Sequence, residues 1–261
     1  MSTQNDNNFV TDEFTAILTG FDQISLNEMD NVQLMNRTDT KYVFNITLLP
    51  DILKKLAFHY RVLNVNENNI SNYKTLYYDT DDFLFYNHHR CGKGNRCKVR
   101  YRTYIQSNLH FFEVKNKNNK EITIKKRIKL IGDSPQINDE SLAFYQHNAI
   151  INDVNLEPKL WANYSRITLV NKTQAERLTL DLNLFFNNDT QCKYLNNIVI
   201  AELKQERRIK SAFTEIMKSY AIKTLSISKY CLGVINLYPD LKQNNFKPKI
   251  LTLNKISHEI Y

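Results

Sequence analysis

Residues 96–104 of the chain are Arg-Cys-Lys-Val-Arg-Tyr-Arg-Thr-Tyr. Successive side chains of a β-strand point to opposite faces, so a strand here has one strongly basic face. The cations on that face are Arg96, Lys98, Arg100 and Arg102. Like charges in a row destabilise a sheet unless an anion neutralises them, and a solvated strand face usually mixes both signs. The stretch therefore predicts a sheet face that holds a polyanion.

Composition sets the scale of the fold. The chain has 261 residues, of which 42% are hydrophobic, enough for one sizeable core or a single large β-structure with attached helices. Its 5 glycines and 5 prolines argue against a low-complexity or fibrous protein. The net charge of +8 favours an anionic partner, which can be a phosphate compound, a nucleic acid or a membrane surface.

The sequence shows no targeting signal. It begins MSTQNDNNFV, without the basic and apolar regions of a signal peptide, and no run approaches the ~18 apolar residues of a membrane helix. Its cysteines form no Cys-x-x-Cys pair, which is typical of reduced thiols in a cytoplasmic protein. The histidines and cysteines within residues 88–97 match no common zinc spacing, and we assign no role to His88 or His89.

Apolar periodicity and turn residues divide the chain into an N-terminal tail and helix (1–30), a main domain (31–237) and a C-terminal tail (238–261). Helices are expected at 13–26, 47–60, 139–150 and 206–222, the second with Thr47 as N-cap and Pro50 in its first turn. Strands are expected at 34–45, 73–79, 96–105, 109–117, 121–130, 162–171, 176–184 and 197–204. Short links between several strands favour an antiparallel meander. The tail shows no clear amphipathic pattern, which leaves both docking and disorder open.

Most of these strands alternate between an apolar face and a charged face. The charged faces include Lys41, Glu113, Lys115, Lys125, Arg127, Arg166, Asp181, Glu202 and Lys204. An open sheet with a solvated outer face also alternates, but such a face usually carries scattered Lys, Glu, Thr and Ser. Here basic residues dominate and acids occur singly. We therefore favour an α+β fold in which an antiparallel β-barrel has a polar interior and helices packed outside.

The motifs along the chain follow the order of a known family. They are Arg37-Thr-Asp-Thr-Lys41-Tyr42, Tyr78-Asp79-Thr80, Lys98-Val-Arg100-Tyr-Arg102, Phe112-Glu113-Val-Lys115, Arg166, Glu202-Leu-Lys204 and Ser228-Lys229-Tyr230-Cys231-Leu232-Gly233. Together they resemble the VTC domain, the polyphosphate polymerase domain of the vacuolar transporter chaperone complex, which also occurs as free-standing bacterial proteins. That family belongs to the triphosphate tunnel metalloenzymes, alongside CYTH-type phosphatases and fungal RNA triphosphatases. The resemblance runs from Arg37 to Gly233.

The resemblance implies an eight-stranded tunnel that binds a triphosphate and a divalent metal, Mn²⁺ or Mg²⁺. VTC members transfer the γ-phosphate of ATP to a growing polyphosphate chain. Carried over by position, the catalytic residues would be Lys41, Arg100, Arg102, Lys115, Arg166 and Lys229. Further phosphate ligands would be Arg37, Lys98, Arg127, Lys125, Lys204 and Ser228. In the fourth strand Arg127 is the preferred match, with Lys125 and Lys126 as its competitors. The metal would be held by Glu202, Glu113 and Asp181, because a hard cation prefers oxygen ligands.

Two positions depart from the family pattern. Asp39 stands where tunnel families usually have Glu, and Ser226 where VTC proteins often carry a basic residue. The sequence contains no SPX domain and no membrane helices like those of the eukaryotic complex, so a membrane partner protein is a further expectation. Two other functions stay open, a tunnel hydrolase of tripolyphosphate or nucleoside triphosphates and a non-catalytic polyphosphate-binding module. Polymerase and hydrolase would use the same ligands, so residue types do not separate them.

Single residues also have alternative interpretations. Glu202 fits an ion pair with Lys204 or an arginine, and Tyr164 fits either a hydrogen bond to phosphate or packing in the tunnel wall. The expected partners are ATP and inorganic polyphosphate or tripolyphosphate. Nucleic acid is not expected, because the charged faces show no ladder of aromatic side chains for stacking bases. The chain also lacks a G-x-G-x-x-G turn with its acidic ribose partner, so we expect tripolyphosphate to bind without adenine.

Overall fold

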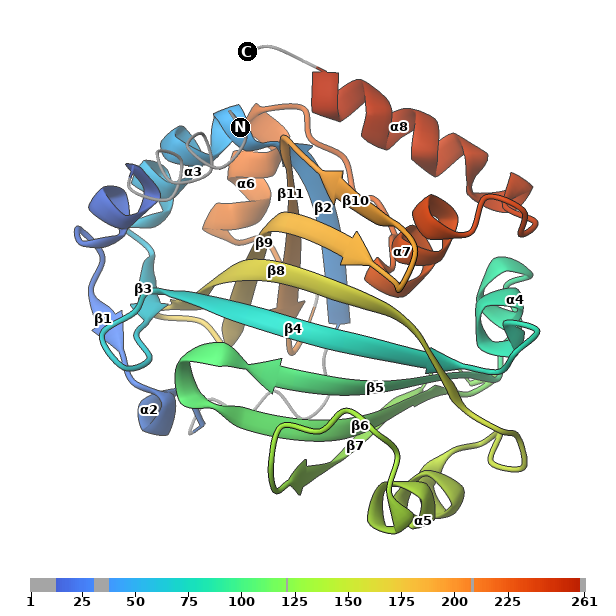
Figure 1. Cartoon of the computed structure of the whole chain (residues 1–261). Coiled ribbons are helices and arrows are strands. Elements are labelled where there is room, and N and C mark those ends of the chain that lie inside the picture. The colour runs from blue at the N-terminus through green and yellow to red at the C-terminus, as the bar shows by residue number, and fades with distance from the viewer. Residues whose placement is uncertain (1–12, 31–37, 121, 208, 259–261) are drawn as a thin grey trace.

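The computed structural model describes residues 13–30, 38–120, 122–207 and 209–258, arranged around one large sheet that is antiparallel except for the β1–β3 pair (Figure 1). Its main path is β2 (Thr38–Asn45), β11 (Ile198–Gln205), β9 (Glu176–Asn187), β8 (Glu157–Asn171), β4 (Ile70–Asp79), β5 (Arg96–Tyr104), β6 (Leu109–Lys117) and β7 (Thr123–Leu130). Shorter strands extend it: β1 (Gln23–Ile24) pairs with β3 (Tyr60–Leu63), β3 pairs with β8, and β10 (Cys192–Leu195) pairs with β9. The predicted antiparallel α+β architecture is confirmed.

Helices cover the outer face of the sheet and lie at its ends (Figure 1). They are α2 (Leu26–Asp30), α3 (Leu49–Leu56), α4 (Leu84–Arg90), α5 (Asp139–Asn148), α6 (Ala212–Ser219), α7 (Lys229–Leu237) and α8 (Lys247–His258), with 3₁₀ turns at Ile46–Leu48, Ile105–Ser107 and Asn244–Phe246. On one half of the outer face, α3 and α6 bury Leu53 and Phe213 in the same core as Leu180. On the other half, Tyr145 of α5 packs in a second core with Phe112. The apolar strand faces predicted from the sequence thus form the cores under the outer helices.

Several predicted boundaries are wrong. The first predicted helix, residues 13–26, is helical only over 13–18, because the chain turns at Gly20 and continues as β1 and α2. The second begins as a 3₁₀ turn capped by Asn45, whose side chain accepts the Thr47 N–H, so Thr47 is not the N-cap. The helix expected from residue 206 begins at Ala212, because β11 continues to Gln205 and Ser211 caps the helix in a capping box with Thr214. Residues 34–37 of the first predicted strand lie outside the described residues.

The sheet curls strongly, although its two end strands do not pair within the described part of the chain. β2 and β5 are five strands apart along the path, about 24 Å in a flat sheet. Yet Lys41 Nζ of β2 donates to the Ile227 carbonyl at 3.1 Å, and Lys98 Nζ of β5 donates to the adjacent Ser228 Oγ at 3.1 Å. The sheet therefore forms a deep concave face rather than a hydrogen-bonded closed barrel. The free edge of β2 instead takes the segment before α7, where the Leu225 N–H donates to the Lys41 carbonyl at 2.9 Å.

One end of the concave face is filled by α7. Its buried Tyr230 and Val234 pack in one core with Leu160 of β8 and Phe186 of β9. A Cβ at Gly233 would lie 2.8 Å from the Leu160 side chain, so only glycine allows this close approach of helix and sheet. The charged half of the concave face lies beyond the N-terminus of α7.

The C-terminal tail docks on the sheet. Leu253 of α8 is buried, and the Asn45 side-chain amide of β2 donates to the Ile256 carbonyl at 2.8 Å. Of the two outcomes left open by the sequence, docking is therefore correct for residues 247–258. In the described ranges, every helix is too short or too polar to cross a lipid bilayer.

Candidate active site

We name the charged half of the concave face the basic face. It comprises Lys41 of β2, Glu202 and Lys204 of β11, Asp181 of β9, Arg166 of β8, Lys98, Arg100 and Arg102 of β5, Glu113 and Lys115 of β6, Lys125 and Arg127 of β7, and Lys229 of α7. Ser228, the N-cap of α7, lies beside it. Lys126 pairs with Val114 on the opposite face, so Lys125 and Arg127 are the inward residues of β7. Arg37 lies outside the described residues. The structure therefore brings the remaining predicted site residues onto one surface.

Asp181 fixes two of the cations. Arg166 donates from Nε at 2.5 Å and from Nη2 at 2.8 Å to its two oxygens, and Lys229 Nζ also donates to Oδ2. Burial opposes ionisation of Asp181, but the charges of Arg166 and Lys229 outweigh it and lower its pKa to about 2. Asp181 is therefore an anion that orients a guanidinium and an ammonium across three elements of the fold.

Glu113 plays the same part on the other side of the basic face. Its side chain is 1% exposed, and its oxygens accept from Arg100 Nε at 2.5 Å and from Lys125 Nζ. Burial raises the pKa of this carboxyl, but Arg100 and Arg102 together hold the pKa well below its usual range. A buried anion of this kind keeps Arg100 extended along the sheet.

Glu202 lies between two lysines. Its Oε2 is 2.5 Å from Lys204 Nζ and its Oε1 is 3.7 Å from Lys41 Nζ. Lys204 also lies 3.8 Å from Asp39, the residue that departs from the family pattern. Burial opposes ionisation, but Lys41 and Lys204 hold the pKa of Glu202 well below its usual range. The ion pair considered as an alternative role for Glu202 is thus present.

The lysines Lys98, Lys115 and Lys125 lie directly opposite one another on β5, β6 and β7. We name them the lysine row. Within the described contacts only Lys125 has a carboxylate partner, Glu113. Lys115 and Lys125 are partly exposed to solvent. Even so, desolvation is the largest cause, and neighbouring cations a further one, of lowered pKa values in the row. The pKa is about 8 for Lys98 and for Lys115 and about 7 for Lys125. Like charges in register destabilise a sheet, and an anion bound between these lysines would relieve their repulsion.

Buried hydroxyls beside the cations have no hydrogen-bond partner among the described residues. They are the Tyr164 hydroxyl on β8 and Thr179 Oγ1 on β9, in side chains that are 3% and 4% exposed. Thr179 lies directly across from Glu202, and Tyr164 lies near Arg102 and Arg166. An unpaired buried hydroxyl costs free energy, which a phosphate oxygen would recover. This observation favours the hydrogen-bonding role for Tyr164 over packing alone.

The sequence predicts no ladder of stacked rings on this face, yet the structure places a row of aromatic side chains there, of which only Tyr73 and Tyr164 are stacked with parallel planes. Tyr164, Tyr73, Tyr104 and Phe111 lie on the neighbouring strands β8, β4, β5 and β6, with successive ring centroids 5.2, 5.0 and 5.6 Å apart. We name them the aromatic row. The sequence did not show it, because each strand contributes one ring and only the order of strands in the sheet brings the rings together.

Two site residues were missed. Asp79 is fully buried and accepts the backbone N–H groups of Thr80, Phe85 and Tyr86, as well as the Tyr230 hydroxyl, so it joins α4 to α7. α4 in turn carries His89 into the basic face, where burial and then Lys98 and other nearby cations lower the His89 pKa to about 2. His89 is thus a neutral imidazole among cations. The spacing of residues in the sequence did not predict a site role for His89, because the helix α4 itself was not predicted.

The carboxylates differ in how well they fit a divalent metal. The Asp181 and Glu113 side chains are 2% and 1% exposed, and cationic side chains donate to both oxygens of each. The Glu202 side chain is 18% exposed, and among the described residues its Oε1 has only Lys41 Nζ at 3.7 Å. Within the described ranges no group of three or more His, Cys, Asp or Glu side chains is placed to hold a metal. Glu202 is therefore the ligand that fits, and phosphate oxygens would have to complete the coordination.

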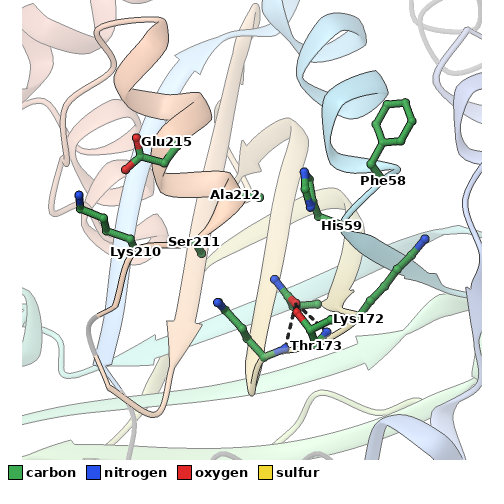
Figure 2. A pocket seen from close by; sticks show the side chains of 10 residues that line it. Phe58, His59, Lys172, Thr173, Lys210, Ser211, Ala212 and Glu215 are labelled. Atoms are coloured by element: carbon green, nitrogen blue, oxygen red, sulfur yellow. Dashed lines mark hydrogen bonds between the residues drawn. The ribbon is translucent and has the colours of Figure 1, made fainter.

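A separate pocket of about 440 Å³ lies on the outer side of the molecule (Figure 2). It lies between the end of α3, the turn after β8 and the start of α6, with Phe58, Lys172 and Ser211 among its lining. It contains none of the residues of the basic face. We assign the candidate site to the basic face, where the charges and the unpaired hydroxyls converge.

Comparisons with known proteins place the chain in a family. No curated protein matches it. Similar solved structures include a proposed adenylate cyclase from Bacillus halodurans, with 14% identity, a TM-score of 0.45 and coverage of 74% of this chain and 96% of that one. Another is HpAC1 from Hippeastrum, described as having a dominant triphosphatase activity, with 12% identity, a TM-score of 0.44 and coverage of 80% and 100%. Nothing about the function of this chain follows from similarity at this level. The family model of the VTC domain, however, matches residues 36–238, most of the sequence, and the chain therefore belongs to the VTC domain family.

Proposed function

We propose that the protein is a polyphosphate polymerase, which transfers the γ-phosphoryl group of ATP to the end of an inorganic polyphosphate chain. The observation that carries the proposal is the lysine row, in which Lys98, Lys115 and Lys125 face one another across three strands. Membership of the VTC domain family supports the same activity. A polyanion of repeating phosphates suits such a row, because neighbouring strands bring these directly opposite side chains within about 5 Å of one another.

In the proposed reaction a terminal oxygen of polyphosphate forms a bond to the γ-phosphorus, the bond to the β–γ bridging oxygen breaks, and ADP leaves. Such a transfer depends on in-line positioning and on stabilising charge at the equatorial oxygens. Arg166 and Arg100 supply fixed guanidinium donors, since Asp181 and Glu113 orient them. Lysines of the basic face act as point charges.

We further propose that Glu202 holds a divalent cation, Mn²⁺ or Mg²⁺. When bound, such a cation would offset the negative charge of the phosphate oxygens. Burial opposes ionisation of Glu202, but Lys41 and Lys204 hold its pKa well below the usual range, so the carboxylate is ionised at neutral pH and available for this role.

A second candidate is a triphosphate hydrolase that uses the same residues with water as acceptor. The observation that favours it is α7, whose side chains fill one end of the concave face together with Leu160 and Phe186. A long product cannot thread past a packed helix, so it would have to leave by the end through which ATP enters. A short substrate such as tripolyphosphate has no such constraint.

The products of ATP distinguish these functions. With ATP and Mn²⁺, the purified chain is expected to form long-chain polyphosphate and ADP, which gel electrophoresis and chromatography would measure beside free phosphate. Glu202→Gln should abolish the Mn²⁺-dependent activity while tripolyphosphate still binds, because the change removes only the anion. Free phosphate as the sole product would establish the hydrolase, and binding without turnover would leave a binding module.

Binding of tripolyphosphate at pH 8 is expected to take up roughly one to two protons. Lys98 and Lys115, with pKa values of about 8, are half neutral at this pH, and Lys125, with a pKa of about 7, is mostly neutral. A bound anion raises these pKa values, so the complex holds more protons than the free protein and affinity falls as pH rises from 7 to 9. Calorimetry in buffers of different ionisation enthalpy measures the uptake. Proton release, or affinity that is constant over this range, would contradict the assignment of the lysine row.

A further inference from the structure

The aromatic row runs across the sheet, from the buried Tyr164 of β8, its inner end, to the half-buried Phe111 of β6, its outer end. At the inner end, cations cover the rings: Arg166 lies 5.0 Å from the Tyr73 centroid and 5.3 Å from that of Tyr164, and Lys229 lies 4.5 Å from that of Tyr164. Contacts of this kind keep the guanidinium and ammonium groups extended. The inner rings are therefore accounted for as supports of the phosphate-binding cations.

Tyr104 is not accounted for in this way, and Phe111 beside it supports only Arg127 of the described cations. Both are half-buried, and no described cation stacks on Tyr104. Arg127 lies over Phe111 at 4.4 Å from its centroid, and the Arg127 side chain is exposed. Partly exposed rings beside an arginine are the usual elements of a surface on which a base stacks.

The position of these rings fits a nucleotide whose phosphates lie on the basic face. Tyr104 follows Arg102 by two residues on the same face of β5, a step of about 6.7 Å. Arg102 is almost fully buried, donates to Thr75 Oγ1 at 3.3 Å and lies 5.5 Å from the Tyr73 centroid, so it is fixed beside the row. A nucleoside attached to a phosphate at Arg102 therefore reaches Tyr104 next.

We propose that the Tyr104 ring, with the Phe111 ring standing at 80° to it as a side wall, forms a stacking site for the base of a nucleoside triphosphate, which holds the donor nucleotide without selecting its base. The inference rests on the proposed function, in which a nucleoside triphosphate donates the phosphoryl group. Stacking on a ring is tolerant of sequence because every base has a flat aromatic face. ATP and GTP should therefore bind with similar affinity.

The test compares ATP with tripolyphosphate in calorimetry on the wild type and on Tyr104→Leu, Phe111→Leu and the double variant. Loss of stacking should weaken ATP binding about 5- to 150-fold more than tripolyphosphate binding in the double variant. Tyr104→Leu alone should leave tripolyphosphate binding unchanged, because no described cation stacks on Tyr104. Tyr104→Phe keeps the ring and should bind ATP as the wild type does. Tyr194→Leu is the matched control, because Tyr194 is exposed, pairs with the Phe185 ring and lies on β10, outside the basic face.

The outcomes separate this inference from the proposed function. If the variants weaken ATP and tripolyphosphate equally, the outer rings only support cations and the stacking site is overturned, as it is if ATP binding does not change. A clear preference of the wild type for one base would also overturn it. If wild-type protein fails to bind tripolyphosphate at all, the proposed function itself fails.

Discussion

Arg166→Ala is expected to lower ATP turnover on the order of 10³-fold or more, the effect of removing a positioned arginine from a phosphoryl-transfer site. Arg166 is fixed by its two-point ion pair with Asp181 and by the rings of Tyr73 and Tyr164. A guanidinium held in this way loses little freedom when a phosphate binds, so its charge acts fully in the transition state. The measurement is kcat at saturating ATP and Mn²⁺.

Two variants act as controls for this result. Arg166→Lys keeps the charge but not the planar two-point contact, so an intermediate loss is expected. Lys193→Ala removes an exposed cation on β10, away from the basic face, and should leave turnover unchanged. Arg166→Ala leaves Lys229 as the remaining partner of buried Asp181, so thermal melting must show that the variant is folded. Wild-type turnover by a folded Arg166→Ala protein would remove Arg166 from the site.

The phase of the strands could be predicted from the sequence because two independent constraints agree. In residues 96–104 the apolar and basic residues alternate with period two, and one-residue slips would put Arg100 and Arg102 into the outer core. The structure confirms this phase, with Val99 and Tyr101 in the outer core and the arginines inward. Strands are therefore the part of the fold that local pattern determines.

The helices that carry the site could not be predicted in the same way, because their stabilising contacts are distant in sequence. α4 begins after Phe83, which has a left-handed φ of 57° and no capping side chain of its own, and the cap comes from Asp79. α7 contains Gly233, which disfavours a helix locally and is required only because Leu160 lies so close. Neither signal is visible without the tertiary structure.

The partners within the site were also beyond sequence reasoning. Each acid was recognised as a candidate metal ligand, but Asp181 is joined to Lys229, 48 residues away, and Glu113 to Arg100 across the β5–β6 pair. Which carboxylates are occupied by cations depends on the curl of the sheet, and periodicity carries no information on curl. The aromatic row was missed because it depends on the order of the strands in the sheet, which periodicity does not give either.

Asp79→Ala is expected to lower the free energy of unfolding by about 3–5 kcal/mol. The Asp79 carboxylate accepts the N–H groups of Thr80 and Phe85 at 2.8 Å and of Tyr86 at 2.9 Å, and it also accepts the Tyr230 hydroxyl. Removing it leaves these buried donors unpaired and separates α4 from α7. Urea denaturation followed by circular dichroism measures the loss.

Matched variants distinguish the loss of the hydrogen bonds to Asp79 from the general effect of removing a negative charge. Tyr230→Phe removes one donor and should cost about 1 kcal/mol. Asp240→Ala removes an exposed aspartate in the turn after α7 and should change stability by less than about 0.5 kcal/mol. Because Tyr230 and Asp79 contact each other, the double variant should cost less than the sum of the two single changes. If the losses of unfolding free energy in the two single variants add up in the double variant, Asp79 and Tyr230 are not coupled. If Asp79→Ala is as stable as Asp240→Ala, α4 and α7 hold His89 and Lys229 in place without this carboxylate.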